Sequence, residues 1–437
     1  MMNLCRLLAG RGLLVSFVVT EEWLQLLGSG SGSSAAASSW PPNLRIRTIP
    51  NVVPSERTRG TDFRKFIQAI YTKMEGPTEE LIEGLQPPAD SILTTSLLAW
   101  AAAIADRRNI PVCSLCTESP AVFLAFHHFE NPDVQLKPSG KERDDALAYL
   151  PRTDTFLFGD AQSSTSSETI IRSYKKALSW FAKSNALLFT SFYELDRHVI
   201  DALSSHLLPL PVYPLGPSIP HMTLADEPLD DDTKISLGWL DSQPECSVVY
   251  IALGSFAPVS ADQMEALADG LKLSGVRFFW VVREGAEPMQ ELAGTGGMGL
   301  AVPWCDQLRV LSHPSVGGFL THCGWNSVLE GVFAGVPMLA FPLVWDQFPN
   351  SRSVVDDWKV GFRLKEEAGR QGGEVVVPKE DVAKMVKKLM DMECSERKRA
   401  KDLQGKCKEA LGEGGSLWRN LDSFVQGLVS SKKSTGN

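Results

Sequence analysis

The feature that most constrains the fold is an alternation of short apolar runs with amphipathic segments along almost the whole chain. Pairs of a strand-like run and a helix-like segment after it include Leu13–Val19 with Phe63–Leu85, Ser91–Thr94 with Leu97–Arg108, Val112–Leu115 with Pro120–Phe129, and Ser247–Leu253 with Ala261–Leu273. Strands that alternate with helices form parallel sheets, and the helices cover both faces of such sheets. The sequence therefore predicts an α/β protein with doubly wound parallel sheets.

The length of the chain predicts two domains, because 437 residues are too many for one hydrophobic core. Residues 216–232 are rich in proline, aspartate and glycine and have no hydrophobic period, which is typical of a linker. We place a first domain at residues 1–217, the linker at 218–232 and a second domain at 233–437. Sheets of this kind bind ligands at the carboxyl ends of their strands, so we expect a cleft between the domains.

The charge and the cysteines limit the partners of the protein. The net charge is −9 and there is no long basic run, which argues against nucleic acid as a partner. No apolar stretch reaches the ~18–20 residues that span a bilayer. The eight cysteines are scattered, as in a reducing compartment, and we interpret the pair Cys113 and Cys116 as core packing. We expect a cytoplasmic monomer.

Two patterns suggest other functions, and we reject both. The first twenty residues look like a signal peptide, but their apolar region contains two arginines and continues into a strand-like run. A G-x-G-x-x-G pattern, typical of dinucleotide sites, is formed by Gly294, Gly296 and Gly299. It leads into the strand-like Leu300–Pro303 instead of opening a helix, so it does not predict nicotinamide binding.

Residues 304–347 contain a pattern that is typical of an anion site. An apolar strand is followed there by the turn THCGWNS and by a helix that begins near Trp325. The turn brings His322, Asn326 and Ser327 to a helix N-terminus, where unpaired N–H groups and the positive end of the helix dipole converge. Asn326 or Ser327 could instead simply cap the helix.

This stretch reads WCDQLRVLSHPSVGGFLTHCGWNSVLEGVFAGVPMLAFPLVWDQ and resembles, from end to end, the signature of the plant family 1 UDP-glycosyltransferases. The resemblance extends to VVYIALGSF before it and to SFYELDRHVIDAL in the first half, and it covers nearly the whole chain. It implies a GT-B-like fold, in which two doubly wound domains face a cleft. It also implies that a final helix, Ser416–Val429, crosses back to the first domain.

The resemblance implies a donor site for a UDP-sugar. The residues that it assigns to this site are Ser255, Trp304, Gln307, His322, Trp325, Asn326, Ser327, Glu330, Asp346 and Gln347. Trp304 would stack on the uracil ring. Gln307 and Glu330 would bind the ribose hydroxyls, since a carboxylate is a natural acceptor for a diol.

The remaining donor residues are assigned to the diphosphate and the sugar. Those implied for the diphosphate are Ser255, His322, Asn326 and Ser327. Trp325, Asp346 and Gln347 would face the sugar, and a tryptophan at position 325 favours glucose over galactose. The helix end would stabilise the leaving diphosphate, so no metal is expected, and UDP-glucose would be a co-substrate without any further cofactor.

The catalytic residues of the family have no match in this chain. In the family, a histidine in the loop after the first strand takes the proton of the acceptor, and an aspartate orients that histidine. The histidines here are at positions 127, 128, 198, 206, 221, 313 and 322, none of them early, and Thr95 stands in the position of the aspartate. We interpret His127 and His128 as surface residues or part of the acceptor wall, and assign no catalytic residue.

The start of the chain accounts for the absent histidine. Met1–Ala9 resembles the helix after the histidine loop, so the first, central strand is not in the sequence. Without it, two strand edges stay unpaired around a groove, at a cost expected to exceed the ~5–15 kcal/mol of total stability. We interpret the sequence as truncated at its N-terminus, with a poorly folding relic as the alternative.

The function implied by the resemblance is inverting transfer of glucose from UDP-glucose to a small, largely apolar acceptor with a hydroxyl or carboxyl group. Its pocket is expected to be built from variable stretches such as Glu118–Phe129 and Leu136–Leu150. The alternative is a catalytically dead protein that binds a UDP-sugar or an acceptor. An upstream strand with a G-x-G-H-type loop would favour the enzyme. A sugar phosphorylase or epimerase is not supported, because neither needs the signature.

Overall fold

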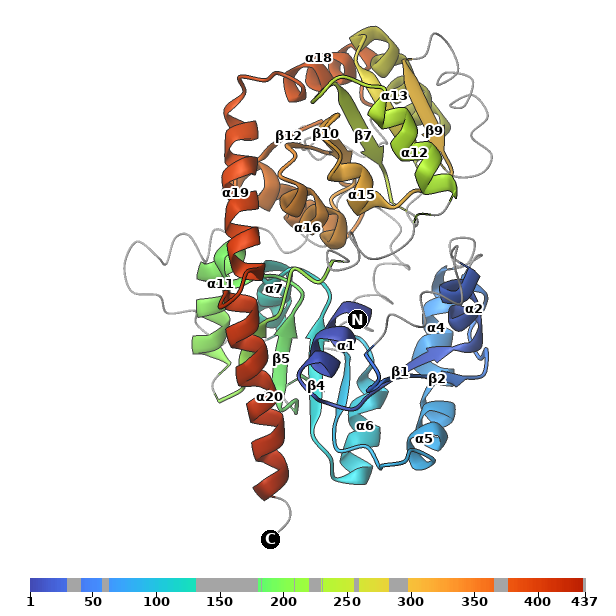
Figure 1. Cartoon of the computed structure of the whole chain (residues 1–437), viewed down its shortest axis with the longest axis vertical. Coiled ribbons are helices and arrows are strands. Elements are labelled where there is room, and N and C mark those ends of the chain that lie inside the picture. Colours follow the sequence, from blue (N-terminus) through green and yellow to red (C-terminus); the bar gives the residue numbers. More distant parts are fainter. Residues whose placement is uncertain are drawn as a thin grey trace. The chain divides into compact units, whose positions relative to one another are not determined.

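The structure is a computed structural model that describes residues 1–29, 41–56, 63–130, 180–181, 183–207, 209–219, 229, 231–254, 259–282, 298–364 and 376–434. These residues form two compact units (Figure 1). The first unit holds the described residues between Met1 and Ser218 together with those from Glu409 onward, and the second holds those between Ile219 and Lys408. Most of the predicted linker at 218–232 lies outside the described residues.

The second unit has a six-stranded sheet with the strand order β12-β11-β10-β7-β8-β9. Its strands are β7 (Val248–Ala252), β8 (Arg277–Val281), β9 (Gly299–Val302), β10 (Val316–Thr321), β11 (Met338–Ala340) and β12 (Gly361–Arg363). All of its pairings are parallel. The side chains of β7, β10 and β11 are buried throughout, as expected of strands covered on both faces.

Helices cover this sheet. They are α12 (Asp231–Asp241), α13 (Ala261–Ser274), α15 (Gln307–Leu311), α16 (Trp325–Ala334), α17 (Gln347–Arg352), α18 (Lys379–Leu389) and α19 (Ser395–Leu411), with a π-helical turn, η3 (Ser353–Asp357), after α17. Helix α13 begins where the Ser260 hydroxyl accepts a hydrogen bond from the Gln263 N–H, and it ends at Gly275, whose φ is +65°. It packs with α18 on the apolar core around β7 and β8.

Gly299 has a packing role. It begins β9, and a Cβ there would lie 2.2 Å from the ring of Phe278 on β8. Leu300–Val302 continue the strand, which agrees with our reason for rejecting the dinucleotide pattern. Gly294 and Gly296 lie outside the described residues. The glycine is therefore needed for close contact between two strands.

The first unit contains two separate parallel sheets. One has four strands in the order β3 (Ile92–Thr95), β4 (Val112–Cys116), β5 (Ala186–Phe189) and β6 (Val212–Pro214). The other pairs β1 (Val15–Thr20) with β2 (Leu44–Ile49). Within the described ranges β1 pairs only with β2, and β3 only with β4.

The helices of the first unit are α1 (Met2–Gly10), α2 (Glu21–Ser29), α4 (Phe63–Lys73), α5 (Glu75–Glu83), α6 (Ala99–Arg108), α7 (Pro120–Glu130), α11 (Tyr193–His206) and α20 (Ser416–Ser434). Helix α1 packs Cys5 and Ala9 against the β1–β2 sheet, so this segment is part of the folded unit. Helix α20 belongs to the same unit, because Ser416 Oγ donates to Glu194 Oε2 (2.7 Å) and Asn420 Nδ2 donates to the Pro214 carbonyl (3.0 Å).

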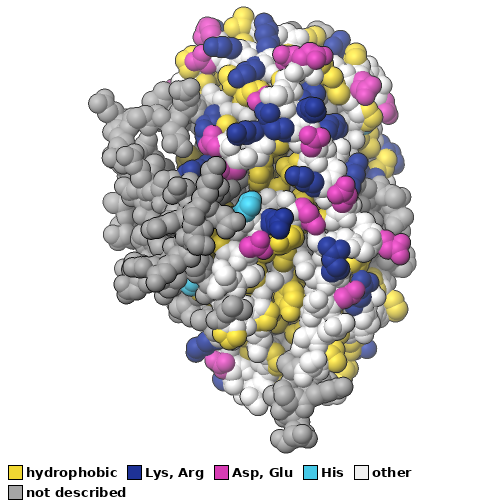
Figure 2. Space-filling model, turned by 90° about the vertical axis from the view of Figure 1, so that its left-hand side faces the viewer, with side chains coloured by type: hydrophobic (Ala, Val, Ile, Leu, Met, Phe, Trp, Pro, Cys, Tyr) yellow, Lys and Arg dark blue, Asp and Glu magenta, His cyan; other side chains and the backbone are white. Residues whose placement is uncertain are grey.

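Surface and core features bear on the expected partners. On the face shown in Figure 2, basic and acidic side chains are interspersed. None of the helices in the described ranges is both long and apolar enough to cross a membrane. Cys113 and Cys116 are buried free thiols in β4, and burial raises the pKa of both.

Candidate active site

His322 occupies a narrow position at the carboxyl ends of two neighbouring strands. Thr321 of β10 pairs with Ala252 of β7, so the loops that follow these strands run side by side. A Cβ on Gly254 would lie 2.6 Å from His322 Nε2, and a Cβ on Gly324 would lie 2.5 Å from the same atom. Gly254 also has a φ of +79°. The imidazole is thus held between two backbone segments that must be glycine.

The N-terminus of α16 lies directly after this histidine. Gly324 is its N-cap residue, and no described side chain caps it. Asn326 is exposed, and the hydroxyl of the buried Ser327 accepts a hydrogen bond from Gln307. The alternative in which Asn326 or Ser327 caps the helix is therefore wrong. An uncapped first turn beside an imidazole is suited to bind an anion.

Two residues assigned to the ribose are in direct contact. Gln307 is the first residue of α15, which Asp306 caps by accepting from the Arg309 N–H (3.1 Å). Gln307 Nε2 donates to Glu330 Oε2 and, over 3.0 Å, to Ser327 Oγ. The first turn of α16 and the start of α15 are thereby joined by side-chain hydrogen bonds.

The charge state of Glu330 depends on its surroundings. The pKa of Glu330 is raised to about 7, chiefly by burial; the hydrogen bond from Gln307 opposes this shift, and the nearby Asp306 adds to it. The carboxyl therefore changes its charge near neutral pH. A hydrogen bond that favours the carboxylate keeps it available as an acceptor for hydroxyl groups.

Trp304 precedes this cluster. It lies between β9 and α15, and 57% of its surface is exposed. The large indole is exposed, and its flat face is available for stacking on an aromatic ring.

Three residues were expected to face the sugar, and the structure shows how two of their side chains are packed. Trp325 is buried, and its ring centroid lies 6.2 Å from that of Trp358. Gln347 is also buried, and its Oε1 accepts from the backbone N–H groups of Leu343 (2.8 Å) and Val344 (3.0 Å). The Gln347 side-chain oxygen thus stabilises its own loop, and the Trp325 ring packs within the unit.

Asn350 is a structural residue of the site that the sequence analysis did not identify. It is fully buried on α17, and its Nδ2 donates to the Cys323 carbonyl and to Asp346 Oδ2, each at 3.0 Å. Cys323 has a φ of +64°, in the left-handed region. Asn350 therefore ties the strained turn after β10 to the loop that carries Asp346. The sequence contained one signal of this contact: Asn350 follows Asp346 by four residues at the start of a helix, a spacing at which side chains can contact each other.

Ser255, the remaining donor residue, lies outside the described residues. Within the described ranges, no group of three or more histidine, cysteine, aspartate or glutamate side chains is arranged to hold a metal ion.

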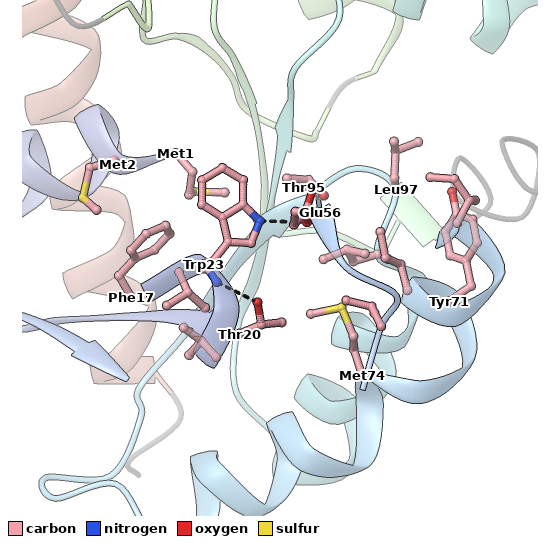
Figure 3. Close-up of a pocket in the computed structure, with 16 residues that line it drawn as sticks. Met1, Met2, Phe17, Thr20, Trp23, Glu56, Tyr71, Met74, Thr95 and Leu97 are labelled. Atoms are coloured by element: carbon pink, nitrogen blue, oxygen red, sulfur yellow. Dashed lines mark hydrogen bonds between the residues drawn. The ribbon is translucent and has the colours of Figure 1, made fainter. Parts of the chain in front are cut away.

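The first unit contains a cavity of about 510 Å³. Most of its lining is apolar, from β1, α1 and α4, and the polar members are Thr20, Glu56, Tyr71 and Thr95 (Figure 3). Trp23 Nε1 donates to Glu56 Oε1 over 2.8 Å. The described lining residues include no lysine, arginine or histidine. The cavity can therefore enclose an apolar molecule and offers it one carboxylate.

This cavity differs from the expected acceptor pocket. In the predicted wall Glu118–Phe129, Phe123 and Leu124 of α7 pack into the core with Phe189 and are not in the cavity lining. The second expected stretch, Leu136–Leu150, lies outside the described residues. An apolar helix that packs in a core has the same composition as one that lines a pocket, and this explains the difference.

His127 and His313 do not line this cavity. His127 contacts Phe181 edge-on with centroids 5.2 Å apart, and His313 Nε2 is 3.1 Å from Asp241 Oδ1. His221 and the side chains of His128 and His206 lie outside the described part of the structure. Thr95 lies at the end of β3 and lines the cavity.

Comparisons with known proteins identify relatives over almost the whole length. The model of the UDP-glucoronosyl and UDP-glucosyl transferase family matches residues 80–393. UDP-glycosyltransferase 87A2 of Arabidopsis thaliana is 40% identical, covering 99% of this chain and 94% of the relative. The 7-deoxyloganetic acid glucosyltransferase of Catharanthus roseus is 30% identical, with 98% and 94% covered. The crystal structure of Os79 from O. sativa in complex with UDP has a TM-score of 0.80 at 23% identity, covering 98% of this chain and 96% of that one.

Proposed function

Because the chain belongs to the UDP-glucoronosyl and UDP-glucosyl transferase family, we propose that it transfers glucose from UDP-glucose to the hydroxyl group of a small, largely apolar acceptor. Its fold is the GT-B fold, and its enzyme class is UDP-glycosyltransferase. The choice of glucose is supported by a relative that is named a glucosyltransferase. The observation that carries the proposal is the polar cluster of Gln307, Glu330 and Ser327 beside His322 and the uncapped α16.

In this proposal the donor binds at the carboxyl ends of β7 and β10. The uracil stacks on Trp304, and the ribose hydroxyls bind Gln307 and the carboxylate of Glu330. The diphosphate lies at the N-terminus of α16, where His322 and the first-turn N–H groups face it. The helix end and the imidazole then balance the charge of the leaving group without a metal.

The proposed reaction is a single displacement. The acceptor oxygen attacks C1 of glucose from the face opposite the diphosphate and forms the new C1–O bond. The bond between C1 and the diphosphate oxygen breaks, and UDP leaves with the electron pair, so the configuration at C1 inverts. The proton of the acceptor hydroxyl passes to a base.

The acceptor is proposed to bind in the cavity of the first unit. Its volume of about 510 Å³ is typical of small-molecule sites, and its lining is mainly apolar. Among the described lining side chains, Glu56 is the one that carries a carboxylate, so we assign it as the group that takes the proton. The Trp23 indole N–H holds this carboxylate in place.

The lining predicts a preference for neutral acceptors. A carboxylate that entered the cavity would lose its hydration and meet Glu56. No described lining side chain is a cation, and burial lowers the pKa of the Met1 ammonium, so that group is less charged. With UDP-glucose as donor, we expect cinnamyl alcohol to be glucosylated at least ~10-fold more efficiently than cinnamate, a discrimination that an unpaired buried charge readily supplies.

The measurement is kcat/KM for the two acceptors, with glucoside formation followed by mass spectrometry. The pair has matched size and differs in the charged group. Equal efficiency, or a preference for cinnamate, would exclude the cavity as the acceptor site. No glucoside from any member of a broad panel of phenols and alcohols would reject the proposed reaction itself.

A further inference from the structure

Tyr250 lies at the centre of β7 and is almost completely buried. Its ring stacks on Phe319 of β10, with centroids 5.2 Å apart, and packs against Phe279 of β8 at 5.8 Å. Both phenylalanines are its register partners on the neighbouring strands. The ring is therefore fixed from both sides, and the position of its hydroxyl is determined by the sheet.

The hydroxyl leaves this apolar layer and meets the polar cluster. Tyr250 OH donates to Gln307 Oε1 over 3.0 Å and lies 3.4 Å from Cys305 Sγ. The Gln307 side chain has one amide oxygen and one amide NH₂ group, and the Tyr250 hydroxyl donates its hydrogen bond to the oxygen. The NH₂ group must then point toward Ser327 and Glu330, as observed.

We propose that Tyr250 is a positioning residue for the nucleotide site: its hydroxyl fixes the orientation of the Gln307 amide, and the amide in turn holds Glu330 for the ribose. This inference rests on the proposed function, since it assumes that Gln307 and Glu330 bind the nucleotide. Tyr250 does not contact the ligand. A phenylalanine there would fill the same space without selecting between the two orientations of the amide.

The charge of Glu330 makes the proposed binding of the nucleotide depend on pH. The groups that face Glu330 are Gln307 and Ser327, the carboxylate of Asp306, and the Tyr250 hydroxyl with Cys305 beside it. Burial and Asp306 raise the pKa of Glu330, and the Gln307 hydrogen bond lowers it. If the amide turns, this hydrogen bond weakens and the pKa of Glu330 rises further. The carboxyl is then neutral over more of the neutral pH range and is a poorer acceptor for the ribose diol.

The test is Tyr250→Phe in the full chain, with the Kd for UDP measured by calorimetry across the neutral pH range. We expect UDP to bind about 5- to 10-fold more weakly at pH 7, since a buried carbonyl oxygen loses its donor. We also expect the midpoint of the pH dependence of binding to move to higher pH. Tyr213→Phe removes a tyrosine hydroxyl from the first unit and serves as the control. We expect its Kd for UDP to be unchanged.

A double-mutant cycle with Gln307→Ala separates positioning from packing. If Tyr250 acts through the Gln307 amide, Tyr250→Phe should have no further effect once that amide is gone. Additive losses in the two variants, or a wild-type Kd and pH midpoint in Tyr250→Phe, would overturn the positioning role. Wild-type chain that does not bind UDP would instead reject the proposed function, on which this inference rests.

Discussion

Replacing Glu56 by glutamine is expected to lower kcat by about 10²–10⁴-fold, the usual contribution of a general base. The KM for the acceptor and the Kd for UDP should change little. Glutamine keeps the oxygen that accepts the Trp23 indole hydrogen bond, so the loop geometry is retained while the basic group is lost. The described lining residues include no histidine, so no described imidazole in the lining can take the proton in place of Glu56.

Glu79→Gln is a suitable control for this variant. Glu79 belongs to the same unit, pairs with Arg107 outside the cavity lining, and should affect kcat little, because surface ion pairs contribute little to stability. The measurement is kcat for both variants. Glu56→Gln should lose most of the activity, and Glu79→Gln should keep it. Wild-type kcat in Glu56→Gln would show that another group takes the proton.

Gly324→Ala is expected to reduce kcat by about 10²-fold and to weaken UDP binding, because it displaces a preorganised donor at the leaving group. The added methyl group would lie 2.5 Å from His322 Nε2. The ring cannot retreat freely, since Gly254 packs against it from the other loop. The imidazole must therefore leave its place at the start of α16.

The matched control is Gly238→Ala in α12, where a Cβ meets no atom within 4 Å. That change should leave kcat unaltered and stabilise the unit slightly, since alanine is the better helix former. Thermal unfolding and kcat are measured for both variants. If Gly324→Ala retains full kcat with a normal melting transition, the position of His322 does not matter for the leaving group.

The parts of the fold that depend on local pattern could be predicted from the sequence. The parallel α/β architecture followed from the alternation of β-strand and helix signals, as in β7 (Val248–Ala252) followed by α13 (Ala261–Ser274). Most of the residues assigned to the donor site lie in one continuous stretch, 304–347, so a resemblance over that stretch was enough to assign them. Within it, the contact between Gln307 and Glu330 joins two helices that follow each other in the chain.

Other features depend on contacts between distant parts of the chain, which no local pattern reveals. Tyr250 reads as an ordinary strand residue, and only the meeting of β7 with the start of α15 brings its hydroxyl to Gln307. The cavity is another example, because Glu56 and Thr95, the last residue of β3, reach it from distant parts of the chain. The packing of the Trp325 ring against Trp358 is a third example, and the expected place of Trp325 facing the sugar stays a prediction.

The most direct test of the donor site is a calorimetric titration of UDP into the full chain and into Trp304→Ala. We expect saturable binding by the wild-type chain and a loss of ~1–3 kcal/mol in binding free energy for Trp304→Ala, by analogy with bases that stack on aromatic side chains. Circular dichroism should show that both proteins are equally folded. No UDP binding by a folded wild-type chain, or equal affinity in the two proteins, would contradict the donor site described here.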